Sequence, residues 1–196
     1  MKKRRLEMVL EQLEGFSAPV LEMEQYTTPP SVASELLYWA HLRGELEQVC
    51  DLGCGTGTLA IGAALMGAEA MGVELDPAAL RIARDNARRL GVHVNWLRGD
   101  VRSIALKRVP TVIMNPPFGA QRGSQGDRVF LQKAMEIGDV IYSIHNSGSE
   151  GFIRRFVEPS SIDEVRRVPL PLRRCFEFHS REVKTIEVEL YRIVCR

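Results

Sequence analysis

The chain has 196 residues, of which 45% are hydrophobic, and its formal net charge is +1 at pH 7. It is long enough to bury a core but too short for a catalytic domain together with a separate recognition domain. The near-zero charge excludes a general electrostatic attraction to nucleic acids. No Cys-x-x-Cys pair occurs and no histidine stands at metal-ligand spacing, so neither zinc nor a disulfide framework is indicated; the cysteines are Cys50, Cys54, Cys175 and Cys195. We expect one compact domain, 1–196, without a bound metal.

The first part of the chain predicts two helices and a loop between them. Apolar residues at helical spacing, from Leu6 to Leu13, predict an amphipathic helix over about 3–14. Its glutamates argue against a secretory leader, and no apolar run is long enough to cross a membrane, so we expect a cytoplasmic protein. A loop at 25–28 then leads to a helix from Pro30 to His41.

The rest of the chain alternates between strand-like and helix-like segments, which predicts a parallel sheet with helices around it. The expected strands lie near 48–53, 69–75, 92–97, 111–115 and 139–145. The expected helices lie near 58–66, 77–90, 128–137 and 149–157. The tail changes character, because 162–172 is a proline-interrupted strand and 183–195 alternates polar and apolar residues. We interpret these two segments as an antiparallel pair at the edge of the sheet.

A glycine-rich turn follows the first strand of this core. Asp51 is followed by glycines at 53, 55 and 57 before an Ala/Leu-rich helix, a pattern that lets a ligand approach the backbone closely. The dinucleotide fingerprint requires a small residue three positions after its second glycine, and Thr58 stands there instead. This disfavours a dehydrogenase.

Acidic residues follow the next two strands. Glu74 arrives where a parallel sheet would present it to a ribose bound over the glycine turn, and Asp100 with Val101 would present a carboxylate and an amide to an adenine ring. Two other interpretations remain open. Glu74 and Asp76 are also typical of charges at the start of the following helix, and Asp100 is typical of a turn.

The sequence Asn115-Pro116-Pro117-Phe118 ends the next strand and indicates a reaction. An asparagine oxygen and a proline-fixed carbonyl can both accept from an exocyclic NH2 group, while an aromatic ring supplies a face for a base to stack on. The alternative is a turn without chemistry. Because ligands bind at the carboxyl ends of strands in open α/β sheets, the order of the four motifs favours the amine-binding role.

In this order the motifs resemble those of Rossmann-fold methyltransferases that use S-adenosylmethionine, in the branch that methylates amino groups. More narrowly, nearly the whole chain is similar to the methyltransferase-like protein five family. The segments that carry this resemblance are Met1–Leu6, Leu21–Thr28, Val112–Gly119, Tyr142–His145 and Phe178–His179. Family members often have proline where this chain has Thr27. The resemblance implies a seven-stranded, mostly parallel Rossmann-like sheet with helices on both faces and an antiparallel C-terminal pair.

The resemblance also implies an activity and site residues. The family methylates adenosine N6 in small-subunit ribosomal RNA, which would make Asn115, Pro116, Pro117 and Phe118 catalytic. It implies that 1–45 is a helical extension with a cofactor-covering loop before a Rossmann-like core, 46–196. Together with the glycine turn and the strand-end acids, the expected cofactor-binding residues are Gln25, Thr28, Asp51, Gly53, Gly55, Thr56, Thr58, Glu74, Asp100 and Val101.

Substrate contacts are expected from two further places. Phe118 and Tyr26 would stack on a base taken out of its helix. The segment 119–127, rich in glycine and small polar residues, would fold over that base with Asp127 and Phe130 at its far end. Deleting 123–126 is then expected to impair methyl transfer far more than cofactor binding.

Recognition of RNA is expected to come from local basic clusters, first of all Lys2–Arg5. A partner is also implied, because an apolar strand at 92–97 would lie at the sheet edge with Trp96 marking the contact. The alternatives are that a crossing loop covers this edge or that Trp96 belongs to the core. The family suggests a small zinc-binding activator protein. Two other functions stay open: methylation of a glutamine side chain in a protein, and a non-catalytic assembly factor that binds RNA or the cofactor.

Overall fold

The computed structural model describes residues 1–20, 23–117, 126–171 and 185–196. Phe118, most of the 119–127 segment, and the tail motif at 178–179 lie outside these residues. Within them the helices are α1 (Lys3–Leu10), α2 (Pro30–Leu42), α3 (Thr58–Leu65), α4 (Pro77–Leu90), α5 (Gly126–Ile137) and α6 (Glu150–Phe156). The strands are β1 (Gln48–Leu52), β2 (Glu69–Glu74), β3 (Asn95–Arg98), β4 (Val109–Met114), β5 (Gly138–Asn146), β6 (Ser161–Pro171) and β7 (Thr185–Val194).

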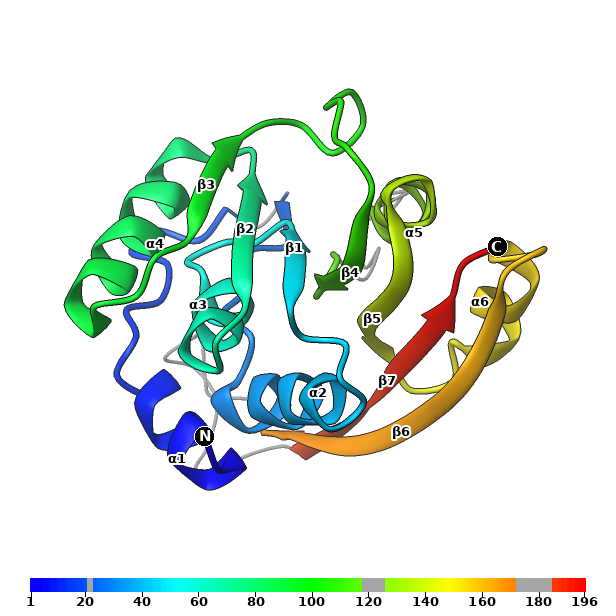
Figure 1. Ribbon diagram of the computed structural model, residues 1–196, viewed down its shortest axis with the longest axis horizontal. Helices are drawn as coiled ribbons and strands as arrows, with labels where there is room; N and C mark the ends of the chain where they lie inside the picture. The colour runs from blue at the N-terminus through cyan, green and yellow to red at the C-terminus, as the bar shows by residue number, and fades with distance from the viewer. Residues whose placement is uncertain (21–22, 118–125, 172–184) are drawn as a thin grey trace.

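The strands form one seven-stranded sheet in the order β3-β2-β1-β4-β5-β7-β6 (Figure 1). The first five are parallel, whereas β7 runs antiparallel to both β5 and β6. This is the expected Rossmann-like fold with an antiparallel C-terminal pair. The order reverses between β1 and β4, which is where a sheet of this kind opens a crevice for a ligand.

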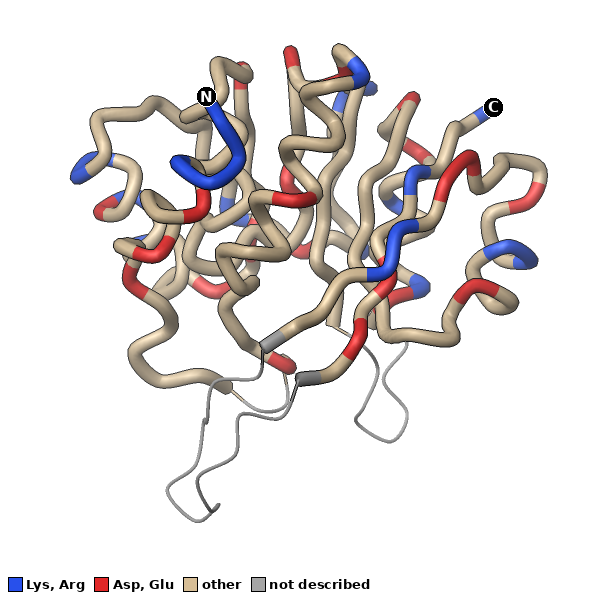
Figure 2. The backbone as a smooth tube through the Cα atoms, turned by 90° about the horizontal axis from the view of Figure 1, so that it is seen from below, with Lys and Arg blue, Asp and Glu red and all other residues tan. Residues whose placement is uncertain are grey.

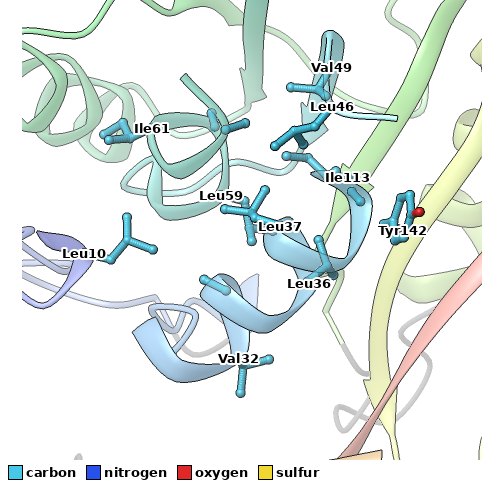
Figure 3. Close-up of a cluster of buried hydrophobic side chains, with 14 of the residues drawn as sticks. Leu10, Val32, Leu36, Leu37, Leu46, Val49, Leu59, Ile61, Ile113 and Tyr142 are labelled. Atoms are coloured by element: carbon cyan, nitrogen blue, oxygen red, sulfur yellow. The ribbon is translucent and has the colours of Figure 1, made fainter. Parts of the chain in front are cut away.

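Two hydrophobic clusters cover the two faces of the sheet. One joins α1, α2 and α3 to the strands, with side chains such as Leu10, Leu36 and Tyr142 fully or almost fully buried (Figure 3). The other joins α5 and α6 to the opposite face through Leu131 and Ile153. In Figure 1 α1 and α2 accordingly lie on one side of the sheet and α6 on the other. None of the helices in the described ranges is long and apolar enough to cross a membrane.

Two expected element boundaries were wrong. In each case backbone groups at the expected end of the element make other hydrogen bonds instead of continuing the helix or strand. The first helix ends at Leu10 rather than near residue 14. The backbone of Glu14 exchanges hydrogen bonds of 3.0 and 2.9 Å with the buried amide of Asn86 instead of continuing the helix. The third strand begins at Asn95 rather than Val92, because Gly91 and Val92 donate to Arg88 and Ala87 and so close the end of α4.

Candidate active site

The register of the parallel strands brings the predicted motifs to one edge of the sheet. Leu52 lies opposite both Val73 and Met114, so that Gly53, Glu74 and Asn115 follow on three adjacent strands. Glu74 in turn lies opposite Arg98, which places Asp100 just beyond the end of β3. The carboxyl ends of four strands therefore meet at one place.

A cavity of about 540 Å³ opens at this edge. Its volume falls in the range of about 300–1,000 Å³ that small-molecule sites occupy. The predicted residues that line it are Gln25, Tyr26, Thr28, Gly53, Gly55, Thr56, Thr58, Glu74, Asp100, Val101, Asn115 and Pro117. Asp51 and Pro116 are buried behind the wall, and Asp127 lies in the first turn of α5 without lining the cavity.

The glycine turn approaches the cavity with no room for side chains. Gly53 and Gly55 have φ angles of +71° and +53°, which L side chains rarely adopt. A Cβ at Gly53 would come within 2.6 Å of the Phe130 ring, and one at Gly55 within 2.9 Å of Phe16. The turn thus requires glycine for its conformation and for the aromatic rings packed on it.

Glu74 is buried, and its carboxylate already serves the backbone around the cavity. One oxygen accepts from the amide of Gly55 at 2.9 Å, and the other from the amides of Leu75 and Asp76 at 2.8 and 2.9 Å. A carboxylate has about four acceptor positions. One therefore remains for a ligand hydroxyl. The helix-start role belongs to Asp76, which caps α4 by accepting from Ala78.

Asp100 lines the far end of the cavity and is held by Arg102. The guanidinium nitrogens of Arg102 lie 2.5–3.0 Å from both carboxylate oxygens, and its backbone amide also donates at 2.9 Å. These hydrogen bonds hold the pKa of Asp100 below its usual value. Asp100 therefore presents a fixed negative charge beside the amide of Val101. The backbone carbonyl of Asp100 accepts from the amides of Ser103 and Ile104 and so forms a turn.

Two buried polar atoms near the glycine turn have no hydrogen-bond partner among the described residues. They are Oδ1 of Asp51 and Oγ1 of Thr56. The other oxygen of Asp51 accepts from Ala60 at 3.0 Å. Burial, with the nearby charge of Glu74 adding to it, raises the pKa of Asp51 to about 8. Because unpartnered buried polar atoms cost free energy, they are typical of a place that a polar ligand completes.

Asn115 is held on both sides of its amide by the segment 25–28. Its Oδ1 accepts from the hydroxyl of Tyr26 at 2.6 Å, and its Nδ2 donates to Oγ1 of Thr28 at 2.9 Å. The segment is itself attached to α4, because Gln25 donates to Asp76 at 2.9 Å. The loop before α2 therefore reaches across the cavity to the end of β4.

Some lining residues carry no signal in the sequence. Phe16 covers Gly55 from a segment without a recognisable motif, and Val129 and Phe130 reach the cavity from α5. Phe130 was expected only as an anchor for the 119–127 segment. An aromatic residue near a glycine turn in space is not near it in sequence, so only the fold reveals these contacts.

The edge strand carries Trp96, which was expected to mark a partner contact. β3 does lie at the edge of the sheet, with Leu97 exposed. Trp96, however, packs inward: a Cβ at Gly72 would come within 2.6 Å of its ring, and one at Gly57 within 2.8 Å. The ring is partly buried against the hydrophobic core, which agrees with the alternative that Trp96 belongs to the core. That Trp96 also marks a partner contact stays a prediction.

Comparison with known proteins places this site in a family. A family model described as the methyltransferase small domain matches residues 31–137, more than half of the chain. The chain belongs to this family. One relative is a zebrafish (Danio rerio) protein named rRNA N(6)-adenosine-methyltransferase METTL5. It is 33% identical to this chain over 98% of both chains. The resemblance to the methyltransferase-like protein five family is confirmed.

Two archaeal proteins are also similar over nearly their whole length. A protein of Methanocaldococcus jannaschii, whose name states no function, is 39% identical over 98% of this chain and 94% of its own. A proposed RNA methyltransferase from Pyrococcus horikoshii is 38% identical in sequence. Its crystal structure matches this one with a TM-score of 0.89 over 100% of this chain and 97% of that one. Family and fold therefore agree with the geometry of the cavity.

Proposed function

We propose that this protein transfers a methyl group from S-adenosylmethionine to N6 of an adenosine in small-subunit ribosomal RNA. The observation that carries the proposal is the amide of Asn115, fixed at the carboxyl end of β4 beside a ligand-sized cavity. The activity named for the zebrafish relative supports the same reaction and the ribosomal substrate.

The cavity fits S-adenosylmethionine in its donors and acceptors. Glu74 would accept from a ribose hydroxyl, while Asp100 and the amide of Val101 would face the adenine ring. The unpartnered Oγ1 of Thr56, which lines the cavity, suits the carboxylate of the amino-acid end, and Asp51, buried behind the wall, would supply negative charge near its ammonium. When bound, the cofactor supplies a methyl group activated by a positively charged sulfur. Gln25 and Thr28, from the segment that crosses the cavity, would close it.

Asn115 and Pro116 would orient the target amine. The lone pair of adenine N6 is delocalised into the ring, so the enzyme must turn the amine rather than first remove a proton. The Asn115 oxygen and the Pro116 carbonyl would accept its two N–H bonds, which stabilises the positive charge that grows on nitrogen. Pro117 fixes the backbone between them and Phe118. The proton then leaves to water.

RNA contacts are proposed for the basic start of α1 and for the surface beside the motif. Figure 2 shows the basic residues gathered at the N-terminus, where Lys3 pairs with Glu35 at 2.6 Å. A second basic pair in the sequence, Arg166 and Arg167, is already engaged, since Arg166 lies over the Trp39 ring and Arg167 pairs with Glu189. We propose that 119–127 covers the flipped base, with Phe118 stacking on it and Asp127 holding the far end.

Transfer of a labelled methyl group from the cofactor into small ribosomal subunits tests the proposal. Asn115→Ala should lower turnover by about 100-fold or more, while the dissociation constant of the cofactor stays unchanged. Isolated release factors serve as a second substrate. Label in a release-factor glutamine would favour the protein methyltransferase instead, and cofactor binding without label in either would favour the assembly factor.

We also propose that the small zinc-binding activator suggested by the family pairs with β3. The strand leaves its outer edge unpaired within the described sheet, and Leu75 and Leu97 expose 42% and 38% of their surface beside it. Leu97→Lys should weaken co-purification with the activator. Light scattering of the chain alone is the control, since a stable monomer at working concentration would count against an obligate partner.

A further inference from the structure

The amide of Asn115 is enclosed by two hydroxyl groups from a segment almost ninety residues away. The hydroxyl of Tyr26 lies 2.6 Å from Oδ1, and Oγ1 of Thr28 lies 2.9 Å from Nδ2. Thr28 is 8% exposed. Both polar ends of the side chain are therefore already bound before any substrate arrives.

The chemistry of the two hydroxyls favours one orientation of the amide. A phenol is a stronger hydrogen-bond donor than an aliphatic alcohol and a weaker acceptor, because its oxygen lone pair is delocalised into the ring. Donation from Tyr26 to the amide oxygen, and from the amide nitrogen to Thr28, uses each group in its better role. The reverse orientation would make the phenol accept and the alcohol donate.

The side chain of Gln25 and two prolines hold the segment that carries both hydroxyls. Gln25, next to Tyr26, accepts from the amide of Val20 and donates to Asp76, at 2.9 Å each. Thr28 is followed by Pro29 and Pro30, whose fixed φ angles begin α2. The two groups thus come from a segment that is attached at both ends.

We propose that Tyr26 and Thr28 are positioning residues that fix the Asn115 amide with its oxygen directed at the target amine. This inference rests on the proposed amine methylation. A carbonyl oxygen has two lone pairs. Tyr26 occupies one, so the amine must approach along the other. A flipped amide would instead present an N–H group to an N–H donor, and the amine would not be held. This role differs from base stacking, which was expected for Tyr26, and from cofactor contact, which was expected for Thr28.

Single-turnover methyl transfer in two backgrounds tests the proposal. Tyr26→Phe keeps the ring and removes the hydroxyl, and we expect about a tenfold fall in the rate, the equivalent of one hydrogen bond. The KM for RNA and the dissociation constant of the cofactor should not change. In an Asn115→Asp background the same substitution should have almost no effect, because the two carboxylate oxygens are equivalent and cannot be flipped. Equal losses in both backgrounds would overturn the proposal, because the hydroxyl would then act independently of the orientation of the amide. No loss in either background would also overturn it and would leave stacking of the ring, which Phe retains, as the role of Tyr26.

Thr28 provides the conservative comparison. Thr28→Val, which removes the acceptor, should slow transfer by a similar factor, whereas Thr28→Ser should restore it. Tyr38→Phe, on α2, is the matched control and should leave the rate unchanged. A Thr28→Ser variant as slow as Thr28→Val would contradict a role for the hydroxyl.

A spectroscopic readout separates this inference from the proposed function. The side-chain NH2 signals of Asn115, assigned by their loss in Asn115→Asp, should exchange slowly with solvent in the native protein and faster in Tyr26→Phe and Thr28→Val. This holds whether or not RNA is methylated. Absence of methyl transfer by the native protein would overturn the proposed function alone, and unaltered exchange in both variants would overturn the positioning role.

Discussion

Polar groups are treated differently at the two ends of the parallel strands. At the carboxyl ends, Asp51 and Thr56 each bury an oxygen without a partner. Before β1, at the other end, Glu45 accepts from Arg192 at 2.9 Å and from the Tyr142 hydroxyl at 2.5 Å. Arg192 also pairs with Asp163 at 2.9 Å.

The difference distinguishes residues that stabilise the fold, such as Glu45 and Arg192, from residues arranged to bind a ligand, such as Asp51. Burial alone would raise the pKa of Glu45, but the hydrogen bonds from Arg192 and Tyr142 keep it below its usual value. At Asp51 burial prevails, and the pKa rises to about 8. Groups arranged for binding commonly reduce stability, whereas a completed ion pair does not leave a charge unpaired.

Replacing Asp51, the acid at the carboxyl ends of the strands, should have the largest effect on stability and its pH dependence. The folded pKa of Asp51, about 8, lies above the unfolded value, so the folded state holds an extra proton between these two values. Stability of the native protein should therefore fall as pH rises from about 5 to about 8, by about 4 kcal/mol from this residue. Asp51→Asn should remove that part of the slope in urea unfolding. An unchanged slope would show that Asp51 ionises normally.

The same variant should also lose a pH dependence of binding. If the ionised Asp51 attracts the cofactor ammonium, affinity of the native protein should rise with pH up to about 8 and then level off. Calorimetry of Asp51→Asn should give a weaker affinity that varies less with pH. A rise that persists in the variant would assign it to another group.

Breaking the completed pair at the other end should cost stability without changing the site. Arg192→Met leaves the partly buried Glu45 without its cation and two charged hydrogen bonds, and we expect a loss of about 2 kcal/mol in urea unfolding. Arg108→Met is the matched control, because its pair with Asp139 is more than half exposed and should contribute little. Cofactor affinity should be unchanged in both. Reduced affinity in folded Arg192→Met would mean that the two ends are coupled.

The glycine turn allows a smaller and sharper comparison. Gly53 and Gly44 both have a φ of +71°, but a Cβ at Gly44 would meet nothing within 4 Å. Gly44→Ala should cost about 1 kcal/mol from backbone strain alone. Gly53→Ala should cost more, because its Cβ meets Phe130, and should weaken cofactor binding as well. Equal stability and equal affinity in the two variants would show that the ring moves away freely.

Much of the fold was predictable because its signals are local. The strand periodicity, the glycine turn and the proline-started α4 each depend on neighbouring residues, and parallel pairing then brings the motif ends together. The N-terminal contacts were not predictable. Glu14 leaves the helical pattern only because Asn86, 72 residues later in the chain, offers better partners.

The candidate site divides in the same way. That Asn115 would stand at a strand end followed from its motif, but its contact with Tyr26 joins residues 89 positions apart. The inward packing of Trp96 depends on Gly57 and Gly72, which lie on other elements. No pattern within one segment records such a pairing.

Asn86 gives the N-terminal segment a further consequence. Its amide nitrogen donates to the carbonyls of both Glu14 and Thr56, at 2.9 and 3.0 Å. One fully buried side chain therefore joins the N-terminal segment to the glycine turn at the cavity. Local opening of either segment leaves one donor of the shared, buried Asn86 amide unsatisfied, which penalises opening of one segment alone. The N-terminal segment and the glycine turn should therefore exchange their amide hydrogens as one cooperative unit. A ligand that binds the glycine turn should then slow the exchange of the N-terminal segment as well.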